Sequence, residues 1–222
     1  MEASDRSTAG HAVHVLHSDE QLLVLDKPAG LLSVPGRGAD KADCLSLRVQ
    51  ALVPDALIVH RLDMATSGLL LMARGPDMQR RLSRAFAERE VSKRYVAVVA
   101  GLLQPPAGGW GVIDLPIAAD WPNRPLRVID RERGQASVTR WRVLAHDQAT
   151  ATTRLELEPV TGRSHQLRVH LKALGHPILG DALYAPGPIA AAAPRLLLHA
   201  CGLRLAHPLT GAALSFESPA PF

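Results

Sequence analysis

The sequence predicts an α+β domain with a mixed, mainly antiparallel sheet and flanking helices. Short apolar runs end at Gly and Pro without the regular strand–helix alternation typical of a parallel sheet. Residues 152–158 alternate strictly, with Thr153, Leu155 and Leu157 on one side and charged residues on the other. Such alternation is typical of an antiparallel strand with one buried face. Two further segments repeat apolar residues at helical spacing.

The first half of the chain shows clear start and stop signals. Lys27 to Gly30 is a turn that ends the first apolar run, Pro54 stops a short helix, and Pro76 with Asp77 opens a longer one. The expected elements are a strand at 21–26, a helix at 46–52, a strand at 69–73, a helix from 75 carrying Met78, Leu82, Ala85 and Phe86 on one face, and a strand at 93–100.

The second half begins with a Gly- and Pro-rich segment, 104–125, which we expect to be a loop. Ser164 is expected to cap a helix that ends at Gly175 and Pro177. The other expected elements are strands at 136–144 and 152–158, a surface loop at 185–194, and strands at 196–200, 203–205 and 214–216.

Composition indicates a soluble, cytoplasmic protein. The 222 residues are 47% hydrophobic and 21% charged, and no apolar run approaches the roughly 18 residues that a membrane span needs. The amino terminus is polar, so no signal peptide is expected. Cys44 and Cys201 make neither a disulfide framework nor a zinc site. A monomer suits this size, and no protein partner is predicted.

Charge is concentrated in arginine clusters, although the net charge is only +4. Arginine side chains match phosphate oxygens and stack on bases, which favours a nucleic-acid partner. A GC-rich genome explains the same composition, and the many Ala and Pro residues agree with that. Composition alone leaves both interpretations open. The clusters are at 80, 81, 84, 89 and 94, at 124, 127, 131 and 133, and at 163 and 168.

The most informative segment is His60 to Gly68, which places Asp63 between two apolar runs. A carboxylate at the junction of two buried strands costs desolvation unless a partner offsets it. A turn explains such a residue structurally, since Asp, Thr, Ser and Gly all favour turns. A catalytic carboxylate is the alternative.

Two other segments carry side chains suited to chemistry. Tyr95 lies in an expected strand, where a tyrosine is usually part of the core. Residues 161–170 combine a turn, a helix start and several hydrogen-bonding side chains, so they predict either an anion site or simple capping by Ser164. The histidines lack metal-binding spacing, and no nucleotide-binding or serine-hydrolase motif is present.

In this order and spacing, these segments resemble the RluA-type family of RNA pseudouridine synthases. The resemblance runs from about residue 20 to residue 222. The matching segments are Lys27 to Leu31, His60 to Gly68, Lys93 to Tyr95, Thr161 to His170, Gly175 to Asp181, Arg195 to Ala200 and His207 with Pro208.

The resemblance implies a pseudouridine synthase fold with a central cleft. Residues 1–19 are then an amino-terminal extension and 20–222 the catalytic domain, with too few preceding residues for an S4 domain. Residues 31–37 and 120–125 resemble the small members that modify both a 23S rRNA loop and a tRNA anticodon stem-loop. Isomerisation needs no cofactor and no metal, and neither is expected.

The resemblance also implies roles for individual residues. Asp63 is the essential carboxylate, which attacks ribose C1′, removes the C2′ proton, or attacks C6 of the base. Arg163 is its ion-pair partner, Tyr95 packs on the target base, and Arg61 fills the place of the flipped nucleotide. The other expected RNA contacts are His60, Thr66, Arg37, Asn123, Arg124, His165, Gln166 and Arg168.

Two other classes remain as alternatives. A noncatalytic RNA-binding protein would not need Asp63. A phosphate-ester hydrolase using Asp63 would need Mg²⁺ held by further carboxylates, and Asp55 and Asp77 do not form a convincing set.

Overall fold

The computed structural model describes residues 13–36, 38 and 41–222, and it confirms the predicted α+β class. The helices are α1 (Leu45–Gln50), α2 (Gly75–Ala87), α3 (Gln166–Ala173) and α4 (Gly187–Ala191). The strands are β1 (His14–Ser18), β2 (Leu22–Lys27), β3 (Ala56–Ile58), β4 (Ser67–Arg74), β5 (Ser92–Ala100), β6 (Gly111–Asp114), β7 (Ile117–Ala119), β8 (Arg127–Ile129), β9 (Val138–Asp147), β10 (Thr152–Pro159), β11 (Leu198–Ala206) and β12 (Ala213–Glu217).

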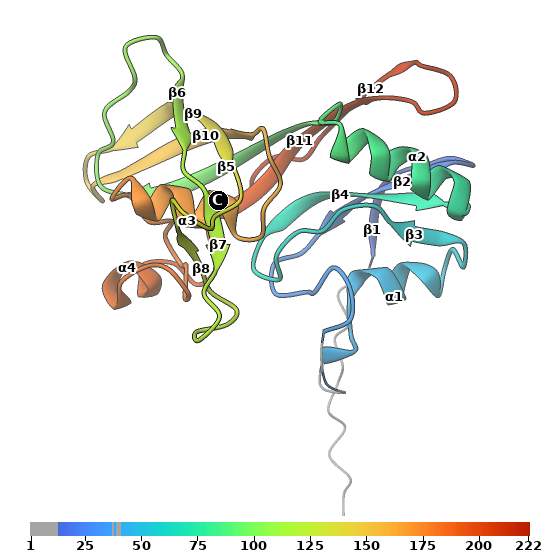
Figure 1. The fold of residues 1–222 in the computed structure, drawn as a ribbon, viewed down its shortest axis with the longest axis horizontal. Coiled ribbons are helices and arrows are strands. Elements are labelled where there is room, and N and C mark those ends of the chain that lie inside the picture. Colours follow the sequence, from blue (N-terminus) through green and yellow to red (C-terminus); the bar gives the residue numbers. More distant parts are fainter. Residues whose placement is uncertain (1–12, 37, 39–40) are drawn as a thin grey trace, which may run out of the picture.

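A ten-stranded sheet organises the fold. Its main path runs β1-β2-β4-β11-β5-β10-β9-β6, with β12 beside β11 and β3 beside β4. The β4–β11 pair is parallel, whereas the other pairs are antiparallel, so the sheet is mixed and mainly antiparallel as predicted. Strands β7 and β8 form a separate hairpin. Figure 1 shows β1–β4 with α1 and α2 on one side of the molecule, and α3, α4 and β6–β10 on the other.

In the first of these halves, the continuous apolar runs of β2 and β4 are buried on both faces. Met78 and Leu82 of α2 pack in one cluster with Leu22, Leu69 and Leu71. Helix α1 packs in a second cluster with the alternate residues, because successive strand side chains point to opposite faces. That cluster includes Leu45, Val49, Leu23, Leu25, Leu70 and Met72.

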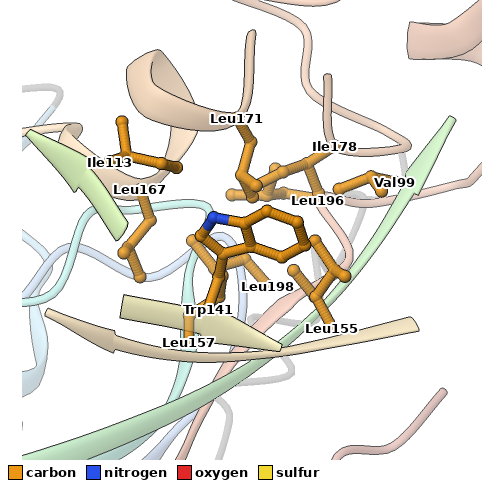
Figure 2. Close-up of a cluster of buried hydrophobic side chains, with 11 residues drawn as sticks. Val99, Ile113, Trp141, Leu155, Leu157, Leu167, Leu171, Ile178, Leu196 and Leu198 are labelled. Carbon is orange, nitrogen blue, oxygen red and sulfur yellow. The ribbon is translucent and has the colours of Figure 1, made fainter. Parts of the chain in front are cut away.

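In the other half, Trp141 of β9 lies within a cluster that joins α3 to the sheet (Figure 2). Leu167 and Leu171 belong to this cluster, together with Leu155 and Leu157 of β10. The predicted burial of Thr153, Leu155 and Leu157 is confirmed, whereas Glu156 on the opposite face is also buried and pairs with Arg142. The cluster fixes α3, whose first turn carries cleft residues, against the sheet.

The segment expected to be a loop, 104–125, is more regular than predicted. It contains β6 and β7, which are short strands at the sheet edge and in the separate hairpin. Their apolar residues are too few to alternate visibly between Gly and Pro. Strand β1, before residue 20, was not predicted, and it pairs with β2.

Three further expectations are corrected near the carboxyl end. The two strands expected at 196–205 are one strand, β11, with an irregularity between Ala200 and Gly202. The loop at 185–194 contains the short helix α4. Ser164 does not cap α3: the N-cap residue is His165, whose backbone is left-handed (φ 58°). Within the described ranges, no helix is long and apolar enough to cross a bilayer.

Candidate active site

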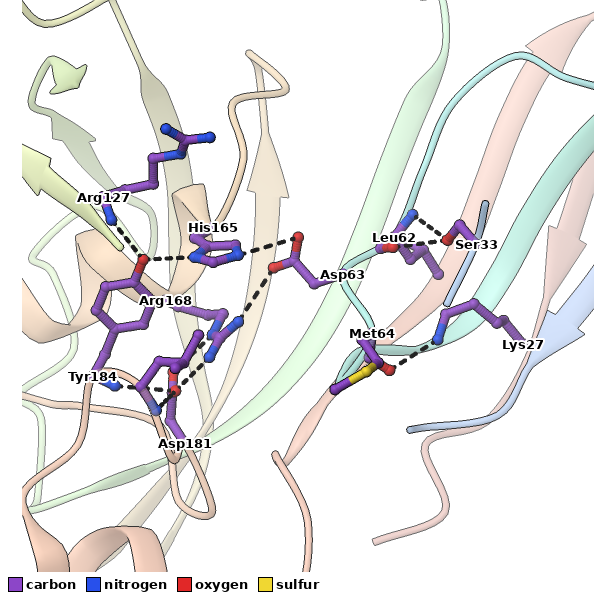
Figure 3. A network of polar contacts seen from close by, with 11 residues as sticks. Lys27, Ser33, Leu62, Asp63, Met64, Arg127, His165, Arg168, Asp181 and Tyr184 are labelled. Carbon is purple, nitrogen blue, oxygen red and sulfur yellow. Dashed lines mark hydrogen bonds and ion pairs between the residues drawn. The ribbon is translucent and has the colours of Figure 1, made fainter. Parts of the chain in front are cut away.

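A cleft of about 980 Å³ contains Asp63. The segment from His60 to Thr66 contributes to its wall, as do Tyr95 of β5 and residues 159–168, which lead into α3. Figure 3 shows the Asp63 side chain reaching from the β3–β4 loop towards His165 and Arg168. The segments singled out in the sequence therefore meet at one hollow.

The backbone on both sides of Asp63 is fixed by hydrogen bonds. Ser33 Oγ donates to Leu62 O at 2.7 Å and accepts from Leu62 N at 3.1 Å. Gly30 N donates to Met64 O at 2.8 Å, and Thr66 N donates to Asp63 O at 3.1 Å. The loop thus holds the Asp63 backbone while the carboxylate, with a side chain 26% exposed, faces the cleft.

Lys27 lies fully buried behind this loop. Its ammonium group donates to the carbonyl oxygens of Pro28 (2.8 Å), Leu31 (2.7 Å) and Met64 (3.1 Å). Burial lowers the pKa of Lys27 to about 7, against the opposing attraction of Asp63. The lysine joins the turn after β2 to the Asp63 loop.

Arg168 is the guanidinium that faces Asp63. Its Nη1 lies 3.5 Å from Asp63 Oδ2. The other edge of the Arg168 guanidinium donates two hydrogen bonds to the Asp181 carboxylate, from Nε at 2.9 Å and from Nη2 at 2.6 Å. Arg168 and Asp181 are both buried, and a bidentate buried pair has a fixed orientation. Asp181 therefore orients Arg168 towards the carboxylate.

His165 is the second group beside Asp63, with Nε2 3.9 Å from Oδ1. Its Nδ1 lies 2.6 Å from the hydroxyl of Tyr184, which also accepts a hydrogen bond from Arg127 N at 2.9 Å. Burial lowers the pKa of His165, and Asp63 opposes that shift. A Tyr184 hydroxyl that donates to Nδ1 leaves the proton of a neutral imidazole on Nε2, facing Asp63.

Tyr95 stands where the two halves of the molecule meet. It packs against the Trp141 cluster and against the α1 cluster, and it also lines the cleft. Burial, and then the negative charge of Asp63, raise the pKa of its phenol. The ring thus offers a neutral aromatic surface beside the carboxylate.

The structure corrects the expected ion pair between Arg163 and Asp63. Arg163 is exposed, and its Nε donates to Ala136 O at 3.4 Å. It precedes α3, whereas Arg168 lies within the helix and is directed inwards by Asp181. Among the described residues, the basic side chains within 4 Å of the Asp63 carboxylate are those of His165 and Arg168.

Several cleft cations have no opposing carboxylate. Six of them form no ion pair with any residue in the described ranges. An excess of unpaired guanidinium and ammonium groups favours a polyanionic ligand. The six are Lys41, Arg61, Arg89, Lys93, Arg127 and Arg163.

Two residues expected to contact RNA use their side chains in bonds within the protein, and a third is buried. His60 Nε2 accepts from Leu71 N at 2.9 Å while its ring stacks on Phe86. Gln166 uses both ends of its buried amide, bonding Thr161, Arg163 N, Val138 O and Thr139. Thr66 is also buried. Their side chains support the cleft wall.

The remaining expected contacts lie elsewhere. Asn123 donates to the Asp120 carboxylate, and the Arg124 guanidinium lies 3.5 Å from the centre of the Trp121 ring. Neither Asn123 nor Arg124 lines the cleft. Arg37 lies outside the described residues.

Sequence reasoning missed Lys27, Asp181 and Tyr184 as parts of the site. Tyr184 carried one signal, because the chain has two tyrosines and both are associated with the site. Asp181 and Lys27 act through buried contacts between distant segments, which spacing does not reveal. Among the described residues, no group of three or more His, Cys, Asp or Glu is placed to hold a metal.

Comparison with known proteins identifies the family. Residues 21–173 match the family described as RNA pseudouridylate synthase. The chain is 48% identical over 208 residues to the dual-specificity RNA pseudouridine synthase RluA of Escherichia coli K12, covering 94% of this chain and 93% of that protein. RluA of Yersinia pestis is also 48% identical, with 94% and 99% covered. This chain is an RNA pseudouridylate synthase.

Solved structures agree with this pseudouridylate synthase assignment. Human RNA pseudouridylate synthase domain containing 1 superposes with a TM-score of 0.78 at 28% identity, covering 95% of this chain and 84% of that one. Human RNA pseudouridylate synthase domain containing 4 superposes with a TM-score of 0.72 at 29% identity, covering 94% of this chain and 88% of that one. As a pseudouridylate synthase, the protein is an isomerase, and Asp63, Tyr95 and Arg168 all lie within the matched region.

Proposed function

We propose that this pseudouridylate synthase isomerises a uridine in a 23S rRNA stem-loop and a uridine in the tRNA anticodon stem-loop. The observation that carries the proposal is the Asp63 carboxylate, which faces a nucleotide-sized cleft rimmed by unpaired cations. The name "dual-specificity" of the bacterial relatives supports two RNA substrates.

The proposed reaction is a rearrangement without redox change. The bond from ribose C1′ to uracil N1 breaks, the base turns within the cleft, and a bond forms from C1′ to C5. The proton on C5 leaves and N1 gains one, so the atoms balance. Asp63 acts either as a nucleophile at C1′ or as a base at C2′, and both roles need its carboxylate free at the cleft surface.

Three residues carry this chemistry in our proposal. Arg168 places its guanidinium 3.5 Å from the Asp63 carboxylate and orients it in the cleft by charge attraction. Tyr95 packs against the uracil and limits its movement during the turn. It is also placed to take part in proton transfer at C5 as a neutral phenol.

The target nucleotide must leave the RNA stack to reach Asp63. Arg61 is exposed, lies two residues before Asp63 and forms no ion pair with a described residue, so it is suited to fill the vacated place. We assign phosphate contacts to Arg163 and the other unpaired cleft cations. Arg37, Asn123 and Arg124 remain candidates for contacts outside the cleft. We further propose that the enzyme acts as a monomer in the cytoplasm.

Tritium release tests the function. Hairpins of the two RNAs, transcribed with C5-tritiated uridine, should lose tritium to solvent in the presence of the enzyme. The same strands annealed to their complements should lose little, because a base-paired uridine resists flipping. Replacing each loop uridine with cytidine in turn identifies the target. Binding without release indicates a noncatalytic RNA-binding protein, and release of phosphate indicates a hydrolase; either result overturns the proposal.

A further inference from the structure

A second hollow of about 410 Å³ lies beside the catalytic cleft. Its wall includes β7, Trp121 after it, and Arg133 beyond β8. Arg127 and Arg163 line this hollow and the cleft alike, so the two are continuous. A ligand that fills the cleft can therefore extend into the second hollow.

The second hollow is strongly cationic. Arg127, Arg133 and Arg163 form no ion pair with a residue in the described part of the chain. Its carboxylate, Asp130, accepts hydrogen bonds from the backbone N–H groups of Arg133 and Glu132, which lower its pKa. Three guanidinium groups around one carboxylate leave positive charge for a phosphate.

Trp121 gives the hollow an aromatic surface. This residue is 68% exposed, which is unusual for so large an apolar group. The Arg124 guanidinium covers one face of the ring at 3.5 Å. Asp120 accepts from both the backbone and the side-chain amide of Asn123, which braces this turn. An exposed, braced ring with an arginine on one face is suited to stack a base on the other.

We propose that this hollow binds a second unpaired nucleotide of the same RNA loop, its base on Trp121 and its phosphate on Arg133. The inference rests on the proposed function and deepens it, because the enzyme then reads two extruded nucleotides. A duplex presents no unpaired neighbour, so the hollow selects loops in which another base is free beside the target.

The test combines protein and RNA variants. Tritium release is measured on a C5-labelled hairpin in which each loop nucleotide other than the target is replaced in turn by an abasic one. With the unaltered enzyme, one position should lower kcat/KM about tenfold, mainly through KM. Trp121→Ala should already have this tenfold lower kcat/KM on the intact hairpin. Its kcat/KM should not fall further when the sensitive position is made abasic. Trp121→Phe retains an aromatic ring, so it should keep most of the sensitivity to the abasic position.

Trp110→Ala is the matched control. Trp110 also has arginines over its ring, Arg140 and Arg142, but it lines neither hollow. This variant should keep the sensitivity to the abasic position. Arg133→Gln removes one proposed phosphate contact, so the slope of log kcat/KM against log salt concentration should become shallower by about 0.7. Arg131→Gln changes an arginine that does not line the hollow and should leave this slope unchanged.

The outcomes separate the two proposals. If the unaltered enzyme releases tritium but the abasic series affects Trp121→Ala and the unaltered enzyme equally, no nucleotide stacks on Trp121 and this inference is wrong. If the unaltered enzyme releases no tritium from any hairpin, the proposed function itself fails, and the second site with it.

Discussion

At the scale of single residues, the site depends on which arginine faces Asp63. Both Arg163 and Arg168 lie in one ten-residue segment, and the resemblance to the family assigned the ion pair to Arg163. In this structure, Arg168 is the arginine that faces Asp63. The left-handed backbone at His165 precedes its helix, and the buried Asp181 carboxylate holds its guanidinium. Neither feature is visible in the spacing of the arginines, because one is a backbone angle and the other a contact across the fold.

Arg168→Lys should lower kcat about 100-fold with little change in KM, because a lysine cannot bind Asp181 in bidentate fashion and also face Asp63. Single-turnover tritium release measures this directly. Arg204→Lys, at an exposed guanidinium 3.9 Å from Glu217, is the control and should be unaffected. A larger loss of kcat in Arg163→Lys than in Arg168→Lys would show that Arg163 is the partner during the reaction.

His60 should make stability depend on pH. Burial, with a smaller contribution from Lys93, lowers its pKa from 6.5 to about 3. Between pH 6.5 and pH 3 the unfolded chain binds a proton at His60 that the folded protein excludes. The contribution of His60 to the free energy of unfolding is therefore largest above pH 6.5 and is lost as the pH falls towards 3. The contribution to the slope is up to about 1.4 kcal/mol per pH unit.

Urea denaturation between pH 7 and pH 5 measures this slope for His60→Gln, whose amide oxygen can still accept from Leu71 N. The variant should show a shallower slope than the unaltered protein. His146→Gln, at the exposed end of β9, should keep the original slope. Equal slopes for all three proteins would mean that His60 binds a proton as readily in the folded protein as in the unfolded chain.

At the scale of elements, the parallel contact between β4 and β11 sets the position of the Asp63 loop. Gly68 pairs with Ala200 and has a φ of 109°, and a Cβ atom there would lie 2.3 Å from Ala200 O. No side chain fits without separating the strands. The loop that carries Asp63 leads directly into this contact.

Gly68→Ala should therefore destabilise the fold by about 3 kcal/mol or more, through overlap and backbone strain together. Gly75→Ala is a matched control, because its φ is also positive (77°) but nothing lies within 4 Å of the added methyl group. It should cost about 1 kcal/mol. Thermal unfolding compares the two, and equal shifts in Tm would contradict the close packing of β4 on β11.

The sequence predicted the elements that carry long or strictly patterned runs and missed the short ones. The buried strands β2 and β4, the alternating β10 and the amphipathic helix α2 all have enough residues for a period to be visible. Strands β6 and β7 have four and three residues, and their pairing depends on distant partners. Within the site, Asp63 was predicted as the carboxylate, whereas Lys27, Asp181 and Tyr184 were hidden by their distance along the chain.

At the scale of the whole molecule, the modest net charge conceals a strongly cationic cleft. The chain has 25 basic and 21 acidic side chains, and many of the acidic ones pair with arginines away from the cleft. The unpaired cations therefore concentrate around Asp63. This distribution distinguishes an RNA-binding surface from a general arginine bias.

The kcat/KM for a hairpin should consequently fall with salt. At about 0.7 per phosphate contact, the six unpaired cleft cations give a slope of log kcat/KM against log salt concentration of about −4.2. Arg89→Gln, which removes one of them, should reduce the slope by about 0.7 without changing kcat at saturating RNA. Tritium-release rates between 50 and 200 mM salt measure both values, and a slope near zero would contradict the cationic cleft as the RNA site.

The central claim is that the Asp63 carboxylate itself performs the isomerisation. Tritium release and hairpin binding, measured on the same preparations of Asp63→Asn and of Asp77→Asn as an exposed carboxylate control, test it most directly. We predict that Asp63→Asn binds the hairpin nearly as tightly as the unaltered enzyme and releases no tritium, while Asp77→Asn does both normally. Tritium release by Asp63→Asn at a rate close to that of the unaltered enzyme would contradict the claim.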